Sequence, residues 1–180
     1  AFVFVAKRHL AAMEQPLPGW HGHAEPFSFT QDYKPHPTID QMLTGTASQL
    51  ATLALETALE VFKDVDMKVL RQKTMALGDL FIALVEQELG GMGFELASPK
   101  DANARGSQVS LTHENGYAIM QAVIARGVVG DFRAPDILRF GFTPLYLDEA
   151  DIDHAAAQIA EVINSKEWDR PEFKVRAAVT

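Results

Sequence analysis

The clearest hydrophobic pattern in the chain lies between residues 64 and 89. Apolar and small residues recur there at alternating spacings of three and four, which is the period of one face of a helix. Asp64 or Asp66 suits the N-cap of such a helix, and Gly90-Gly91 suits its end. We therefore predict one long amphipathic helix with a single packing face. That face carries Met67, Leu70, Thr74, Leu77, Phe81 and Leu84.

Shorter elements follow this helix. Apolar runs predict strands at residues 94–96, 108–111, 128–129 and 137–140. A helical pattern over residues 116–126 is closed by Gly127, and Asp148 caps a final helix with Asp151 in its first turn. Together these elements predict a compact α/β domain over residues 64–165, followed by a charged, loosely ordered tail over residues 166–180. The final helix turns four residues toward the core: Ile152, Ala156, Ile159 and Ile163.

Residues 1–63 are patterned differently. The run Phe2-Val3-Phe4-Val5 is typical of a strand buried on both faces, yet residues 6–45 offer no strand to pair with it. We therefore expect the chain to be the C-terminal part of a longer polypeptide. Residues 48–62 are apolar around more than half of a helical wheel, which predicts a helix buried between layers.

Residues 8–47 form a long segment without a sustained period. Five prolines exclude regular helix through most of it. Its aromatic content is too high for simple disorder, so we expect an ordered loop packed on another surface, such as that of a second subunit. The aromatic residues are Trp20, Phe27, Phe29 and Tyr33.

Composition narrows the classes of protein. A net charge of −8 without a basic patch argues against a nucleic-acid surface, and no apolar stretch is long enough to span a bilayer. The absence of cysteine excludes disulfides and thiolate metal sites. Of six histidines only His21 and His23 lie close in sequence, without a third ligand, so no metal site is predicted. A cytoplasmic protein is expected.

Two places in the sequence suggest anion binding. Arg139 stands on a short apolar strand, where a guanidinium needs an anion, either the carboxylate of a substrate or one of the chain's own acids. Thr46 and Ser48 precede a helix whose free N–H groups suit a phosphate, although the sequence by itself favours a plain capped helix. Both sites together would suit a phosphorylated cofactor that handles an amino or keto acid.

Four motifs resemble the kynureninase family in order and interval, from Ala1 to about Ile163. They are Gly19-Trp20-His21-Gly22-His23, Thr44-Gly45-Thr46, Gly127-Val128-Val129-Gly130-Asp131-Phe132-Arg133 and Arg139-Phe140-Gly141-Phe142-Thr143-Pro144-Leu145-Tyr146. The resemblance implies a homodimeric pyridoxal 5'-phosphate enzyme of the aspartate-aminotransferase fold (fold type I), with active sites shared between subunits. Residues 1–63 would then end the large cofactor-binding domain, with an interface loop and a linker helix, and residues 64–165 would form the small domain.

The resemblance also implies roles for individual residues. Arg139 would bind the α-carboxylate of the substrate. The family hydrolyses kynurenine, or 3-hydroxykynurenine, to alanine and the corresponding anthranilate. Trp20 and Thr46 would donate to the cofactor phosphate in the neighbouring subunit's site. His21 replaces an aromatic residue that is usual in the family and would lie near the substrate ring, which leaves the preference between the two substrates open.

The family's Schiff-base lysine would lie upstream of Ala1, so no catalytic residue is expected in this chain, and activity would need the upstream segment. Two other functions stay open at this point. Another enzyme of the same fold, such as a cysteine desulfurase, would need a reactive cysteine, which this chain lacks. A non-catalytic binding or dimerisation fragment would need no further residues.

Overall fold

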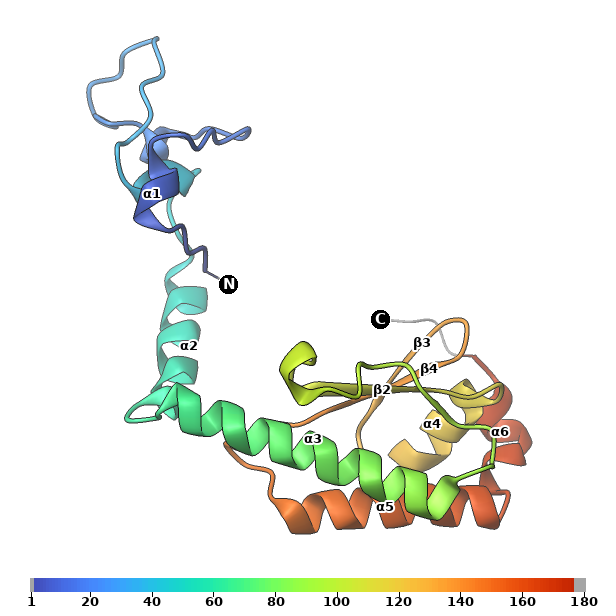
Figure 1. Cartoon of the computed structure of the whole chain (residues 1–180). Coiled ribbons are helices and arrows are strands. Elements are labelled where there is room, and N and C mark those ends of the chain that lie inside the picture. The colour runs from blue at the N-terminus through green and yellow to red at the C-terminus, as the bar shows by residue number, and fades with distance from the viewer. Residues whose placement is uncertain (1, 177–180) are drawn as a thin grey trace. The chain divides into compact units, whose positions relative to one another are not determined.

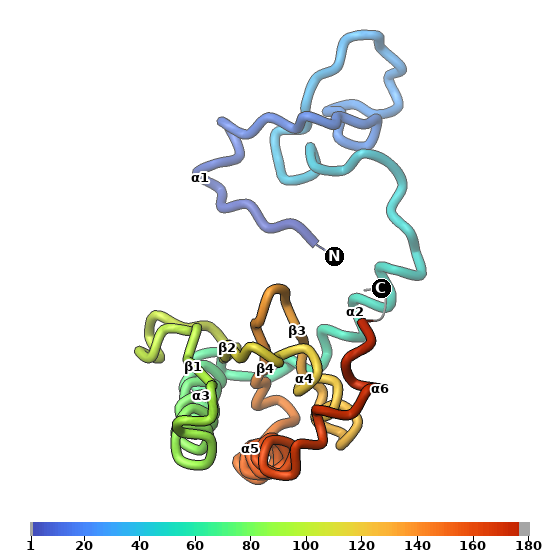
Figure 2. The backbone as a smooth tube through the Cα atoms, turned by 90° about the vertical axis from the view of Figure 1, so that its right-hand side faces the viewer, coloured from blue at the N-terminus to red at the C-terminus, as the bar shows by residue number. Residues whose placement is uncertain are grey.

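The computed structural model describes residues 2–176. The chain forms two compact units, Ala1–Asp64 and Val65–Thr180. The second unit is a four-stranded antiparallel sheet in the order β1-β2-β4-β3, with helices lying against one of its faces (Figures 1 and 2). Its elements are α3 (Met67–Leu89), β1 (Glu95–Leu96), η4 (Ala102–Ala104), β2 (Gln108–Thr112), α4 (Gly116–Ala125), β3 (Asp131–Arg133), β4 (Ile137–Gly141), α5 (Glu149–Asn164), η5 (Glu167–Asp169) and α6 (Pro171–Lys174).

The long helix α3 confirms the strongest sequence prediction. The carboxylate of Asp66 accepts hydrogen bonds from the backbone N–H groups of Lys68 and Val69, and Gly90 ends the helix. The final helix α5 is likewise capped by Asp148, in a capping box with Asp151. Both helices start where a side-chain acceptor satisfies N–H groups that have no partner inside the helix.

The core forms where these helices meet the sheet. Phe81 of α3 is fully buried, and its ring centroid lies 5.1 Å from that of Phe140 on β4. Leu138, two residues before Phe140, is also fully buried, so alternate residues of β4 face the helices. The packing stripe predicted from the sequence is largely confirmed, although Met67 at its start is 60% exposed.

The predicted strand at residues 128–129 is wrong. Val129 is 84% exposed, and the strand of this region is β3, which pairs with β4. Gly127 adopts φ +89° where the chain leaves α4, and Gly130 lies so close to Met120 and the Arg139 carbonyl that a Cβ there would overlap Met120. The two valines therefore lie in the connection between α4 and β3, and the more polar residues Asp131–Arg133 pair with the sheet.

The tail is more ordered than predicted. Residues 166–176 contain η5 and α6, and two of their aromatic side chains, Trp168 and Phe173, pack against the core. These apolar side chains fix a segment whose composition is otherwise charged. Residues 177–180 of the predicted tail lie outside the described residues.

The first unit contains short helical turns and one longer helix. Residues 2–6 form no strand, which corrects the prediction for the Phe2-Val3-Phe4-Val5 run, and Phe4 is 82% exposed. The reason is that this unit supplies no neighbouring strand to pair with the run. The elements are α1 (Lys7–Leu10), η1 (Trp20–Gly22), η2 (Ile39–Met42), α2 (Gln49–Leu59) and η3 (Glu60–Phe62).

Helix α2 begins at the predicted place but is not buried. The Ser48 hydroxyl caps it by accepting from the N–H of Ala51, 3.4 Å away. No residue of α2 is buried, and Leu50 is 82% exposed. The predicted burial between layers is therefore absent from the described part of the chain, because no described element covers this apolar helix.

The buried arginine of the second unit is Arg105, whose side chain is 2% exposed. Its Nη1 donates to the backbone carbonyls of Pro99 and Lys100 at 2.9 and 3.0 Å, and its Nη2 pairs with Asp79 of α3. Gly78 of α3 lies beside it, since a Cβ there would be 3.3 Å from Nη2. The guanidinium thus attaches the loop before β2 to the long helix.

Replacing Arg105 with Met should lower the free energy of unfolding by about 2–3 kcal/mol, because two carbonyls and a carboxylate lose their donor. Urea unfolding of the protein measures the change. The matched control is Lys68→Met on an exposed position of α3, which should change the stability by less than about 0.5 kcal/mol. Equal stabilities of the two variants would show that Arg105 does not hold the loop.

Candidate functional site

Arg139 lies in the middle of β4, on the sheet face away from the core. Its strand neighbours Leu138 and Phe140 point into the core, so the strand's alternation directs Arg139 to the opposite face. In the sheet register Arg139 stands opposite Ser110 of β2 on one side and Asp131 of β3 on the other. The core packing of Leu138 and Phe140 therefore sets the direction of the Arg139 side chain, although Arg139 is not part of that core.

The guanidinium of Arg139 forms an ion pair with Asp131. Nη2 donates to the Oδ2 atom of Asp131, and the same oxygen lies 3.4 Å from Nε of Arg133. Two cations thus share one carboxylate, which leaves a net positive charge on this part of the sheet. The Arg139 side chain is 30% exposed, while its buried Nε has no hydrogen-bond partner among the described residues.

Both interpretations of Arg139 drawn from the sequence thus have a physical basis. The arginine does meet one of the chain's own acids, Asp131. The pairing uses one terminal nitrogen, however, and among the described residues Nη1 has no partner. A partly exposed guanidinium with a free N–H edge and surplus positive charge can bind a carboxylate.

A second candidate site lies in the first unit, around Trp20. Gly19 packs directly on the backbone of Thr44, where a Cβ would overlap the carbonyl. Gly22 is similarly close to the carbonyls of Gln41 and Leu43, at 2.7 and 2.8 Å from where its Cβ would lie. Two glycines three residues apart therefore let the turn η1 lie against the segment that follows η2.

This packing brings the Trp20 indole beside Gly45. A Cβ on Gly45 would lie 3.8 Å from the indole Nε1, and Thr46 is the next residue. Since Ser48 caps α2, the hydroxyl of Thr46 is not needed as a cap. Within the described chain, neither the indole N–H nor this hydroxyl has a hydrogen-bond partner, and Thr46 is exposed. Two uncommitted donors beside a glycine fit the oxygens of a phosphate group.

The two histidines of this turn differ in their surroundings. His23 accepts the N–H of Glu25 at Nδ1, 2.9 Å away, and its Nε2 lies 3.2 Å from the Asp32 carbonyl, so both ring nitrogens serve the loop. The His21 ring stands edge-on to Trp20, with the ring centroids 3.9 Å apart. No group of three or more potential metal ligands occurs in the described part of the chain.

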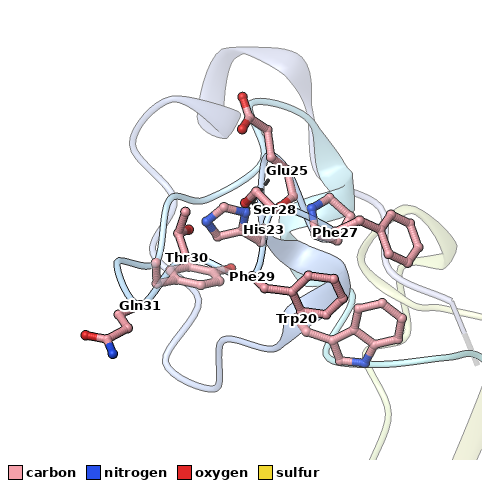
Figure 3. Close-up of a pocket in the computed structure, with 10 residues that line it drawn as sticks. Trp20, His23, Glu25, Phe27, Ser28, Phe29, Thr30 and Gln31 are labelled. Carbon is pink, nitrogen blue, oxygen red and sulfur yellow. Dashed lines mark hydrogen bonds between the residues drawn. The ribbon is translucent and has the colours of Figure 1, made fainter.

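An open cavity of about 610 Å³ adjoins Trp20 (Figure 3). Phe27 and Phe29 line it and are 72% and 85% exposed, and the Phe27 ring lies 5.7 Å from that of Trp20. The long loop presents apolar side chains that the described residues do not cover. That it is an ordered loop packed on another surface, such as that of a second subunit, stays a prediction.

The sequence interpretation overlooked two residues. The sequence assigns Asp131 no role, although Asp-Xaa-Arg on a strand beside a second arginine signals an ion-pair cluster. Gln41 is 4% exposed, and its side chain donates to the carbonyls of Leu10 and Thr38, both 3.4 Å away. Nothing in the hydrophobic pattern marks this buried amide.

In the described part of the chain, no helix is long and apolar enough to cross a membrane. Among solved structures, a NifS-like protein is similar at a TM-score of 0.49 and 15% identity, over 81% of this chain and 38% of that one.

Known relatives share much more sequence. The chain is 47% identical over all 180 residues to kynureninases of Burkholderia mallei (strain SAVP1) and Burkholderia pseudomallei (strain 1106a), and 42% identical to the kynureninase of Pseudomonas fluorescens. It spans 43% of the length of each of them. The sequence profile of the kynureninase C-terminal domain matches residues 70–159, which confirms the predicted resemblance. The sheet and helices of the second unit agree with the predicted α/β class. By these matches the chain belongs to the kynureninase family, of which it represents a C-terminal portion.

Proposed function

We propose that the full-length protein containing this chain is a kynureninase. It would hydrolyse the Cβ–Cγ bond of L-kynurenine, or of 3-hydroxykynurenine, to L-alanine and anthranilate, or to 3-hydroxyanthranilate, in tryptophan catabolism. The observation that carries this proposal is the 47% identity to kynureninases over every residue of the chain. Activity would require the upstream segment, in which we expect the cofactor's lysine.

The first unit suits the cofactor phosphate. The Trp20 indole N–H and the Thr46 hydroxyl would donate to phosphate oxygens, and Gly45 lies beside the indole. Pyridoxal 5'-phosphate, when bound, supplies an electron sink for negative charge formed beside the amino-acid nitrogen. In a homodimer with shared active sites, these donors would serve the neighbouring subunit.

The second unit suits the α-carboxylate of the substrate. Arg139 would hold the α-carboxylate through its free N–H edge. Anchoring the carboxylate while the cofactor is held by its phosphate restricts rotation of the substrate, and this restriction is the source of positional catalysis. His21, beside Trp20, would lie near the aromatic ring. The enzyme would act in the cytoplasm, on a small molecule and without nucleic acid or membrane.

Turnover by the full-length protein tests the proposal. Loaded with pyridoxal 5'-phosphate, it should release anthranilate from L-kynurenine, followed by its fluorescence, together with an equal amount of L-alanine. L-Cysteine serves as the comparison substrate for a desulfurase. Release of alanine and sulfur from cysteine, without cleavage of kynurenine, would contradict the proposal.

Arg139→Lys should raise the KM for L-kynurenine about 10- to 100-fold, because a fork that matches a carboxylate becomes a point charge. The Kd for the cofactor should change little. Steady-state kinetics and a spectral titration with cofactor measure the two quantities. Arg170→Lys on the surface of the same unit is the control. An unchanged KM in Arg139→Lys would show that Arg139 does not bind the substrate's α-carboxylate.

Trp20→Phe should raise the Kd for pyridoxal 5'-phosphate about tenfold, because phenylalanine keeps the ring but lacks the N–H that donates to a charged oxygen. Titration of the apoenzyme, followed by the cofactor's absorbance, measures this Kd. The matched control is Trp168→Phe, since Trp168 packs against the core of the other unit. Equal affinities in both variants would show that the Trp20 N–H does not reach the phosphate.

A further inference from the structure

The Arg139 guanidinium has three nitrogens in three different situations. Nη2 donates to Asp131, Nε is buried without a partner, and Nη1 has no partner among the described residues. Since Nε is inaccessible and one N–H of Nη2 donates to Asp131, the side of the guanidinium left to receive an anion is the edge formed by Nη1 and the second N–H of Nη2. This division follows from the pairing with Asp131.

We propose that Asp131 is a positioning residue, which orients the Arg139 guanidinium so that Nη1 and the second N–H of Nη2 face the substrate's α-carboxylate. The inference rests on the proposed function and adds a residue that acts through Arg139. Asp131 suits this role because it stands directly opposite Arg139 in the register of β3 and β4, so its carboxylate comes from a neighbouring strand.

The need for such a partner arises from the open face of the sheet. An unrestrained arginine side chain carries about 2 kcal/mol of rotamer entropy, which binding would otherwise have to overcome. The inward neighbours of Arg139 fix its backbone but not the end of its side chain. The ion pair with Asp131 reduces this freedom before the substrate arrives.

Asp131 also keeps a second cation in place. Arg133 lies two residues away on the same face of β3, with Nε 3.4 Å from the shared oxygen. Without Asp131, the two guanidiniums would lie near one another with no counter-ion between them and would repel. With it, the cluster keeps a single surplus positive charge, which one substrate carboxylate can neutralise.

The charge of Asp131 has an opposing effect on substrate binding, so the direction of the change in KM distinguishes the two roles. The charge of Asp131 also repels an incoming carboxylate, so a purely electrostatic role predicts tighter substrate binding once that charge is removed. Because Asp131 is 46% exposed, solvent screens this repulsion. The loss of a charge-assisted hydrogen bond to Arg139 should outweigh it.

The test uses the full-length enzyme loaded with its cofactor. Asp131→Ala should raise the KM for L-kynurenine about tenfold. Asp131→Asn, whose amide oxygen still accepts from Nη2, should fall between this variant and the wild type. The inhibition constant of kynuramine, which is kynurenine without its carboxylate, should stay within about twofold, since no carboxylate is bound.

Asp136→Asn is the matched control. Asp136 lies at the turn between the same two strands, and no ion pair is formed by its carboxylate within the described chain. It should leave both constants unchanged.

An unchanged or lower KM in Asp131→Ala would overturn the positioning role while the wild type still cleaves kynurenine. Equal weakening of kynurenine and kynuramine would also overturn it, because that pattern indicates a general structural defect. A wild-type enzyme that does not cleave kynurenine would remove the proposed function, and this inference with it.

Discussion

The burial of Leu138 and Phe140 is the constraint on which the second unit depends. Both side chains pack between the sheet and the helices, with Phe140 in contact with Phe81 of α3. Side chains alternate along a strand, so this packing leaves Arg139 no direction except outward. A slip of one residue in the register of β4 would bury the guanidinium and expose two core residues. The core thus determines the direction of a charged group that it does not touch.

The first unit is organised by close backbone contact instead of a core. Gly19 and Gly22 lie against the segment that follows η2, and these contacts place the Trp20 indole beside Gly45. Much of the remaining apolar surface is uncovered, on α2 as well as on Phe27 and Phe29. Exposed apolar surface of this extent is typical of a segment that packs against another surface.

Sequence reasoning succeeded where local chemistry decides the structure. Helical periodicity together with the caps Asp66 and Asp148 predicted α3 and α5, because capping and amphipathicity are local properties. It failed at residues 128–129, because the backbone turn at Gly127, and not hydrophobicity, determines which residues pair with β4. It also failed for the Phe2-Val3-Phe4-Val5 run, because a strand depends on a partner that its own residues do not encode.

The candidate site divides in the same way. The motifs around Trp20, Thr46 and Arg139 were recognisable from residue type and interval. The pairing of Arg139 with Asp131 was not, because it depends on which residues β3 and β4 place opposite each other. The anchoring of Arg105 to two loop carbonyls also depends on the path of a loop, which no periodicity describes.

The approach of Gly19 to Thr44 has a thermodynamic consequence. This contact brings the neighbouring residues Trp20 and Thr46 near each other, although a long irregular loop separates them in sequence. Ordering that loop costs conformational entropy. A phosphate bound by both residues would bridge the two ends of that loop, and its binding free energy would add to the stability of the closed loop. By the same linkage, if both donors bind the phosphate, a substitution within residues 21–45 that loosens the loop would weaken phosphate affinity without changing either donor.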